Sequence, residues 1–298
     1  MKKFVAALLF LTFAFVPAFS WSGEDVNARL GSFANAINAT IPNAATEQNV
    51  YSSAWIGKLF PSAPPRLAIG VEAGVTRLDT QPLKDAARIF GVTGLPGMLA
   101  YPTLTANARI GGFFLPFDIG FSAMYLNLNK LESIADGLGF RFFDIGGDFR
   151  WAVLKGEGPQ PQLSVGAGYY YTSGDVSYSK EGLYTKMEYA THTAFVQAQV
   201  SKTFIFFTPY LGFRGIFSKS EAKWNWQVSA ERILAASNYS SYAYGGAGRK
   251  ESDWFKNFMP QVYGGFGLNF GFFALNFSAA YEFVNKIWGG NLSIRFQM

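Results

Sequence analysis

The sequence predicts a closed, antiparallel, up-and-down β-barrel of about ten strands that spans a membrane, preceded by a short helical segment. Three observations lead to this all-β transmembrane class. The 298 residues are 18% aromatic but only 15% charged, whereas soluble domains carry about a quarter charged residues. After the first twenty residues, no run of about eighteen apolar residues could form a membrane-spanning helix. Apolar and polar residues instead alternate along many short segments, as expected for strands between lipid and a wet interior.

The first twenty residues have the composition of a secretion signal. Residues 2–3 are a basic pair, and residues 4–16 form an apolar stretch too short to span a bilayer. Ala18 and Ser20 are small residues at the two positions that a signal peptidase reads. We therefore expect residues 1–20 to be a signal peptide that is removed on export.

Residues 21–62 follow a helical pattern in their first part. Ser22 is a suitable N-cap, and apolar residues recur at helical spacing from Val26 to Ile37. We therefore expect one amphipathic helix over about residues 24–38. Two positions for this segment are open: a lead-in that packs on the rim of the barrel, or a plug inside its lumen.

Residues 63–298 carry the alternation and are expected to form the barrel. The last segment is the clearest, because Leu292, Ile294 and Phe296 alternate with Ser293 and Arg295. Ten such segments occur, and an even number brings both ends of the barrel to one side. They cover residues 67–76, 104–114, 117–125, 143–153, 162–171, 193–200, 210–217, 261–270, 275–283 and 291–298.

The connections between the segments alternate in length. Pro116 and Phe117 suit the centre of a tight turn, which places Ile110 and Phe121 on the same apolar face. Short connections are expected near Pro116, 155–159, 208–209 and Gly271, and longer ones at 79–101, 127–139, 175–183 and 218–258. Short turns on one side and long loops on the other are the topology of outer-membrane barrels, whose long loops lie outside the cell.

With these strands and loops, the chain resembles the bacterial outer-membrane β-barrel proteins over most of residues 67–298. Members of that superfamily usually end in an aromatic residue that the barrel-assembly machinery reads. This chain has Phe296 two residues before its end, and its last residue is Met298. The resemblance implies location in the outer membrane with both termini in the periplasm, contact with outer-membrane lipid, and the barrel-assembly machinery as a partner during biogenesis.

The polar face of the predicted barrel would line its lumen. Charges in a narrow lumen are costly unless they are paired, and in a pore they set ion preference; both roles are open. The candidate lumen-lining residues are Glu72, Asn107, Arg109, Asp118, Asp144, Asp148, Arg150, Arg214, Glu282 and Arg295.

No enzyme, cofactor or metal site is predicted. His192 is the single histidine and shares the apolar parity of Ala194, with no evident carboxylate partner for general acid–base chemistry. No cluster has metal-ligand spacing. The net charge of +5, which falls further without the signal peptide, is too small to indicate a nucleic-acid partner. The chain has no cysteine and therefore no disulfide, lipoprotein anchor or thiolate chemistry.

Two functions follow from this class. The first is a passive channel for small hydrophilic solutes, or a largely structural barrel. The alternative is a surface binding protein or adhesin that acts through the long connection 218–257, which is rich in Tyr, Trp and Ser. For a channel, we expect the helix at 24–38 to sit at or within the periplasmic mouth and to restrict flow.

Overall fold

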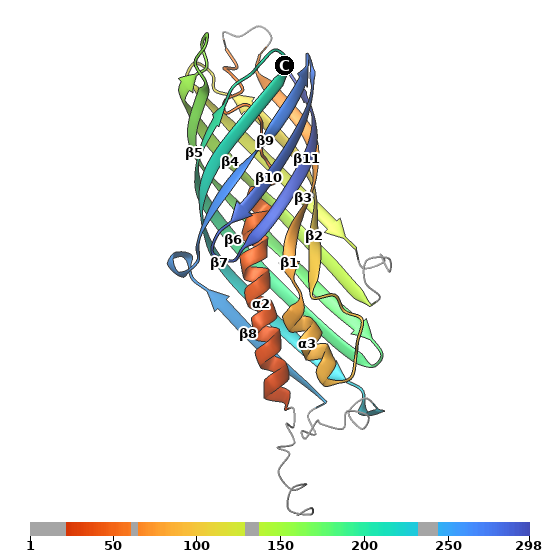
Figure 1. Ribbon diagram of the computed structural model, residues 1–298. Coiled ribbons are helices and arrows are strands. Elements are labelled where there is room, and N and C mark those ends of the chain that lie inside the picture. The colour runs from red at the N-terminus through yellow and green to blue at the C-terminus, as the bar shows by residue number, and fades with distance from the viewer. Residues whose placement is uncertain (1–21, 61–64, 129–136, 232–243) are drawn as a thin grey trace, which may run out of the picture.

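The computed structural model describes residues 22–60, 65–128, 137–231 and 244–298, and ten of its strands close into an antiparallel barrel (Figure 1). Closure is made by β1, which pairs with both β2 and β11, and by β7, which pairs with both β6 and β9. The barrel strands are β1 (Leu67–Asp79), β2 (Met98–Gly111), β3 (Phe117–Asn127), β4 (Leu138–Lys155), β5 (Gln162–Lys180), β6 (Leu183–Ser201), β7 (Phe207–Val228), β9 (Phe258–Phe270), β10 (Phe273–Glu282) and β11 (Ile287–Gln297). Each predicted segment overlaps one of these strands, so the predicted fold class is confirmed.

The alternation sorts side chains between the two faces of the wall as the sequence predicts. Along β3, Phe121 and Tyr125 are 56% and 64% exposed, whereas Asp118 and Ser122 are buried. An apolar belt therefore surrounds a polar interior, which is the arrangement of a barrel in lipid. No helix among the described residues has the length and apolar character needed to cross a membrane.

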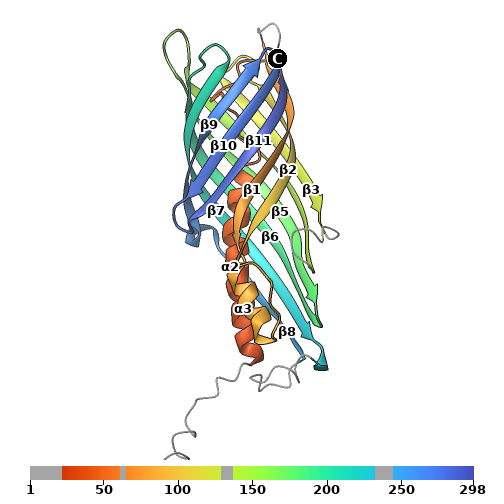
Figure 2. The same cartoon turned by 45° about the vertical axis from the view of Figure 1, so that its right-hand side comes forward.

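The barrel has two unlike ends, which we name the short-turn end and the long-loop end. At the short-turn end, residues 112–116, 156–161, 202–206 and 271–272 join neighbouring strands, and the C-terminus lies there (Figures 1 and 2). At the long-loop end, the β1–β2 connection contains α3 (Gln81–Ile89). The β7–β9 connection there contains β8 (Gly245–Ser252), which pairs with the last part of β7, and the short 3-10 helix η1 (Trp254–Lys256).

Two of the expected connections are wrong in detail. Residues 175–183 are not a loop, because β5 and β6 continue until Lys180 pairs with Leu183 around the turn Glu181–Gly182. Both turn residues have positive φ, 51° and 79°. The turn predicted at Pro116–Phe117 is also wider. Its connection spans residues 112–116, and the Phe117 carbonyl, already in β3, accepts the Gly112 N–H at 2.6 Å.

The predicted helix is α2, which is longer than expected and runs over Gly23–Thr46. Ser22 is its N-cap, in a reciprocal capping box with Asp25. The helix begins at the long-loop end and ends inside the barrel (Figure 2). The chain then runs through the lumen to the short-turn end, where the Leu59 N–H donates to the Gly112 carbonyl at 2.8 Å.

This path corrects two expectations. The start of α2 lies at the long-loop end, so the helix is not at the short-turn mouth, where the sequence predicts it. The two ends of the barrel itself lie together at the short-turn end, as expected, because Ala68 pairs with Gln297. The described chain, however, begins with α2 at the opposite end (Figure 1). The apolar stripe of α2 explains the position, because the lumen wall is polar and the apolar inner surface lies at the long-loop end.

That apolar surface belongs to the parts of β4–β7 that extend beyond the apolar belt. Together with α3, these parts enclose the first half of α2. We name this region the outer chamber. Leu30, Phe33 and Ile37 of α2 are at most 1% exposed there and share one apolar cluster with Trp224 and Trp226 of β7. Both indole N–H groups donate to the amide oxygen of Asn27, at 3.2 and 3.0 Å. The two tryptophans thus hold the helix and are not an exposed binding tip.

Candidate functional site: a filled lumen

All ten candidate lumen residues lie on the inner face of the barrel wall, and each is at most 6% exposed. The structure brings six of them together in two groups, one across β2–β4 and one between β1 and β11. The other four lie apart. Whether any of the ten contacts a solute stays a prediction.

The larger group is a cluster of two arginines and two aspartates. Arg109 contacts Asp118 (Nη1–Oδ1, 2.6 Å) and Asp148 (Nη2–Oδ1, 2.6 Å). Arg150 contacts both carboxylate oxygens of Asp118, at 2.8 and 2.9 Å. Gly120 lies opposite both Arg109 and Asp148, and a Cβ there would come within 2.5 Å of the Arg109 guanidinium. The four formal charges balance, as a buried cluster requires.

The second group is the buried ion pair between Arg295 and Glu72, with an Nη2–Oε2 distance of 2.9 Å. The remaining candidates have local roles. Arg214 lies 3.9 Å from the centre of the Tyr263 ring. Glu282 accepts the N–H groups of residues 284 and 285, and so closes the β10–β11 turn. Asp144 accepts a hydrogen bond from the Thr172 hydroxyl, and Asn107 accepts one from the Tyr51 hydroxyl.

Between these groups lie residues 47–56, which we name the lumen segment. Tyr51 is its centre. Its ring lies 3.7 Å from the guanidinium carbon of Arg295, 4.7 Å from that of Arg109 and 5.9 Å from that of Arg150. One aromatic ring therefore joins the two charged groups through cation–π contacts.

The rest of the lumen segment is bound to the wall on several sides. Towards β3 and β4, Asn49 donates to Asp148 at 2.8 Å, and the Ile56 N–H donates to Asp118 at 3.1 Å. Further contacts to β6, β10 and β11 are Gln199 to the Tyr51 carbonyl (2.7 Å), the Ala54 N–H to Ser201 (2.8 Å), Asn276 to the Val50 carbonyl (3.2 Å) and Asn291 to the Glu47 carbonyl (2.8 Å). The lumen of this structure is thus occupied by the chain itself.

Sequence reasoning left open whether residues 21–62 form a plug or a lead-in, and it did not single out residues 47–56 as the part that fills the lumen. Three aromatic residues of the inner wall pack against this segment and the end of α2. Tyr170 and Phe195 share a cluster with Ala45, and Tyr210 shares one with Val50. The signal that could have found the segment is its composition, because the amides and hydroxyls of residues 48–53 match a polar wall.

The sequence offers two further candidate sites, His192 and the long connection 218–257. His192 is half-buried on the outer face, where its ring contacts Tyr169, Tyr171 and Trp254. Among the described residues, no group of three or more His, Asp and Glu side chains could hold a metal ion. Most of the Ser/Tyr-rich tip of the 218–257 connection, residues 232–243, lies outside the described residues. The expectation that the protein is not an enzyme stays a prediction.

Strand pairing, the apolar belt and the polar interior define a closed transmembrane β-barrel. The sequence matches no protein-family model and no curated protein sequence. Solved structures that are similar in backbone include the outer membrane protease OmpT from Escherichia coli (9% identity, 78% of this chain, 97% of that chain, TM-score 0.47). Another is the translocator domain of the autotransporter NalP from Neisseria meningitidis (8% identity, 95% of this chain, 100% of that chain, TM-score 0.41). A third is a major outer membrane protein from Thermus thermophilus (9% identity, 78% of this chain, 99% of that chain, TM-score 0.33).

Proposed function

We propose that this protein is a largely structural outer-membrane barrel. Its lumen segment closes it to solutes, and the barrel wall holds the outer chamber at the cell surface, where the chamber can bind a partner. In this proposal the long-loop end faces outward and the short-turn end faces the periplasm, as the lengths of the connections favour. The start of α2 is then at the cell surface, and Met298 is in the periplasm.

The occupied lumen is the observation that carries the proposal. Displacing residues 47–56 would leave Asp148 without Asn49, Asp118 without the Ile56 amide, and three guanidinium groups without the Tyr51 ring. Buried hydrogen bonds to charged groups contribute about 1.5–3 kcal/mol each. Several of them must break together, so opening is a rare event at equilibrium.

A gated channel for small hydrophilic solutes is the second candidate, and one observation favours it. Several buried lumen atoms have no hydrogen-bond partner within the described part of the chain. They include Glu72 Oε1, Asn276 Oδ1 and Ser293 Oγ. Buried polar groups of this kind bind water, and a hydrated wall next to a segment held by non-covalent contacts would suit an opening motion.

Single-channel conductance of the refolded full-length protein distinguishes the two. We expect no stepwise conductance from the unmodified chain if the barrel is closed. In an Ala54→Cys, Ser201→Cys variant, a disulfide would tie the lumen segment to β6, where the Ala54 N–H already contacts Ser201. The chain has no other cysteine to compete. Openings in the unmodified protein that the oxidised variant loses, and regains on reduction, would favour the gated channel and contradict closure.

A further inference from the structure

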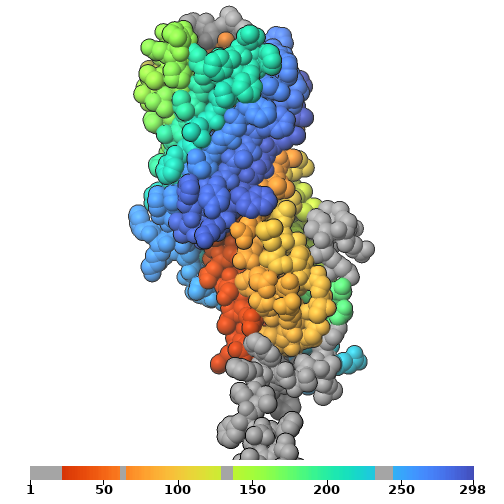
Figure 3. Space-filling view, viewed as in Figure 1, coloured from red at the N-terminus to blue at the C-terminus, as the bar shows by residue number. Residues whose placement is uncertain are grey.

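The wall of the barrel is low on one side of the long-loop end, and α2 is uncovered there (Figure 3). Two adjoining hollows of about 220 and 190 Å³ lie between α2 and this low wall. They share Asn35 and Ala39 of α2 and Asn285 of the β10–β11 turn. We name the pair of hollows the notch.

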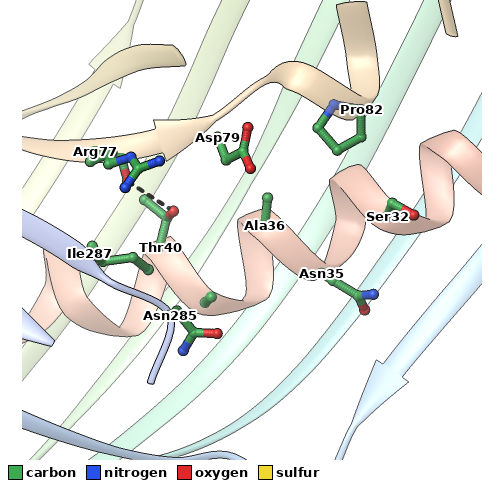
Figure 4. Close-up of a pocket in the computed structure, with 10 residues that line it drawn as sticks. Ser32, Asn35, Ala36, Thr40, Arg77, Asp79, Pro82, Asn285 and Ile287 are labelled. Carbon is green, nitrogen blue, oxygen red and sulfur yellow. Dashed lines mark hydrogen bonds between the residues drawn. The ribbon is translucent and has the colours of Figure 1, made fainter. Parts of the chain in front are cut away.

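Amides, hydroxyls and apolar side chains line the notch, with Arg77 beside the carboxylate of Asp79 at one side and Lys256 at the other. Figure 4 shows one hollow, in which Asn35 and Thr40 lie on the helix side and Arg77 and Asn285 lie on the wall side. The other hollow adds Asn38, Asn257 and Lys256. Amides and hydroxyls that point into a hollow suit a ligand with many hydroxyl groups, and the two cations suit an anionic group.

The buried amide oxygen of Asn38 independently favours a polar ligand in the notch. Its side chain lines the notch and is only 6% exposed, yet its amide oxygen has no hydrogen-bond partner among the described residues. Arg77 is in a similar state: one of its terminal nitrogens donates to the Lys286 carbonyl at 3.1 Å, while its buried Nε has no partner within the described ranges. Buried polar groups are normally paired, so a ligand that entered the notch could supply both missing partners.

The rim of the notch places it at the level of the membrane surface. Phe258 and Val284 line the second hollow and are 47% and 62% exposed. Beside them, Phe255 and Phe283 are 91% and 51% exposed. A group of exposed apolar residues next to a polar hollow is what a lipid needs, because its chains and its headgroup require different surroundings.

We propose that the notch binds the phosphorylated sugar headgroup of a lipid in the surrounding leaflet. The sugar hydroxyls bond to Asn35, Asn38 and Asn285, and the phosphate lies against Lys256 or Arg77. The acyl chains lie along the exposed phenylalanines. A soluble sugar phosphate offers the same polar chemistry without the chains. The inference does not depend on whether the lumen conducts.

Lipid binding by the full-length protein in phosphatidylcholine nanodiscs tests the inference. The probe is a disaccharide lipid with two phosphate groups, titrated into the discs and followed by native mass spectrometry. Glucosamine phosphate and inorganic phosphate are added from solution in parallel. We expect the lipid to bind at least tenfold more tightly than either soluble probe.

Asn35→Trp should fill the notch and reduce lipid binding at least tenfold, because Asn35 is exposed and lines both hollows. Ala28→Trp, at an exposed position of the same helix outside the notch, is the matched control. Lys256→Ala should weaken binding of the phosphorylated lipid and leave its dephosphorylated form unaffected, with Lys250→Ala as control. Equal binding by Asn35→Trp and Ala28→Trp would overturn the site. Equally tight binding of glucosamine phosphate would overturn the lipid as its ligand.

Discussion

The lumen and the outer chamber hold the two halves of one N-terminal segment by opposite chemistry. Within the belt, residues 47–56 are held by ion-paired arginines and aspartates and by amides. In the outer chamber, the first half of α2 is held by an apolar cluster that includes Phe33, Trp224 and Trp226. A single barrel wall therefore has a polar inner face in one region and an apolar inner face in the other.

The change occurs within single strands. In β4, Asp148 and Arg150 point inward at the level of the belt, while Phe140 and Phe142 point inward in the chamber. The outward residues change in the opposite sense, from Phe149 in the belt to Arg141 in the chamber. The solvent explains the inversion. The wall is surrounded by lipid at one height and by water at the other, so its apolar face must turn from outside to inside.

The two regions should also differ in what they contribute to stability. Apolar burial stabilises the folded state directly, at about 25 cal/mol per Å² removed from water. A buried ion-pair cluster contributes little net stability over an apolar replacement, but it is very sensitive to the loss of one partner. The following predictions test this difference, from the largest expected effect to the smallest.

Removing one arginine of the lumen cluster should have the largest effect. Arg109→Met leaves Asp148 buried without its cation, and breaking a buried pair costs about 3–5 kcal/mol. The control is Lys223→Met on the outer face of β7 in the chamber, where the side chains of Lys223 and its partner Glu221 are 58% and 42% exposed. That change should cost about 0–1 kcal/mol. Urea unfolding in lipid vesicles measures both, and equal losses would contradict the assignment of the cluster to a dry interior.

Truncation in the chamber should cost about 2–5 kcal/mol. Leu30 is fully buried against the apolar cluster, so Leu30→Ala creates a cavity. Because the lumen segment is held separately, hydrogen exchange should speed up in residues 23–37 and change little in residues 47–56. Equal acceleration in both would show that the two halves are held as one unit.

A charge on the outer face should mark where the belt ends. Phe121→Arg, on the exposed face of β3, should cost about 2–4 kcal/mol near the midplane of the membrane and less towards its surface. Tyr184→Arg, on the outer face of β6 in the chamber, should cost about 0–1 kcal/mol. A large loss from Tyr184→Arg in the same unfolding assay would place the chamber wall in lipid.

The helix start should show the smallest effect. Hydrogen bonds from the hydroxyl and N–H of Ser22 lower the pKa of Asp25 below its ordinary value. The capping box therefore stabilises the helix fully at a pH above the ordinary pKa of an aspartate. This stabilisation is lost as the pH falls through the lowered pKa of Asp25. Ser22→Ala should cost about 1 kcal/mol at neutral pH. The protection factors of the first-turn amides, which correct for the intrinsic pH dependence of hydrogen exchange, should fall on acidification in the unmodified protein, but hardly in Asp25→Asn.

The sequence alone predicts the barrel, its ten strands and the inner position of all ten candidate residues, because period-two alternation against lipid is a local signal. It predicts the N-cap and the apolar stripe of α2 for the same reason. It does not predict that residues 175–180 continue β5, whereas the alternating flank of the 218–257 connection does indicate that β7 continues past residue 217. In both extensions the inward residues are apolar, as at Val176, Trp224 and Trp226, so the polarity no longer matches a lipid-facing strand.

Only the tertiary structure decides where the N-terminal segment lies and what it contacts. The Tyr51 contacts join residues 49–56 to strands more than fifty residues away, and no local pattern encodes such pairs. The direction of α2 depends on which end of the barrel has an apolar inner face. That in turn depends on how far each of the neighbouring strands extends beyond the apolar belt. The polarity of a strand's two faces is determined by its own residues. Which segment fills the lumen is determined only by the closed wall that all the strands form together.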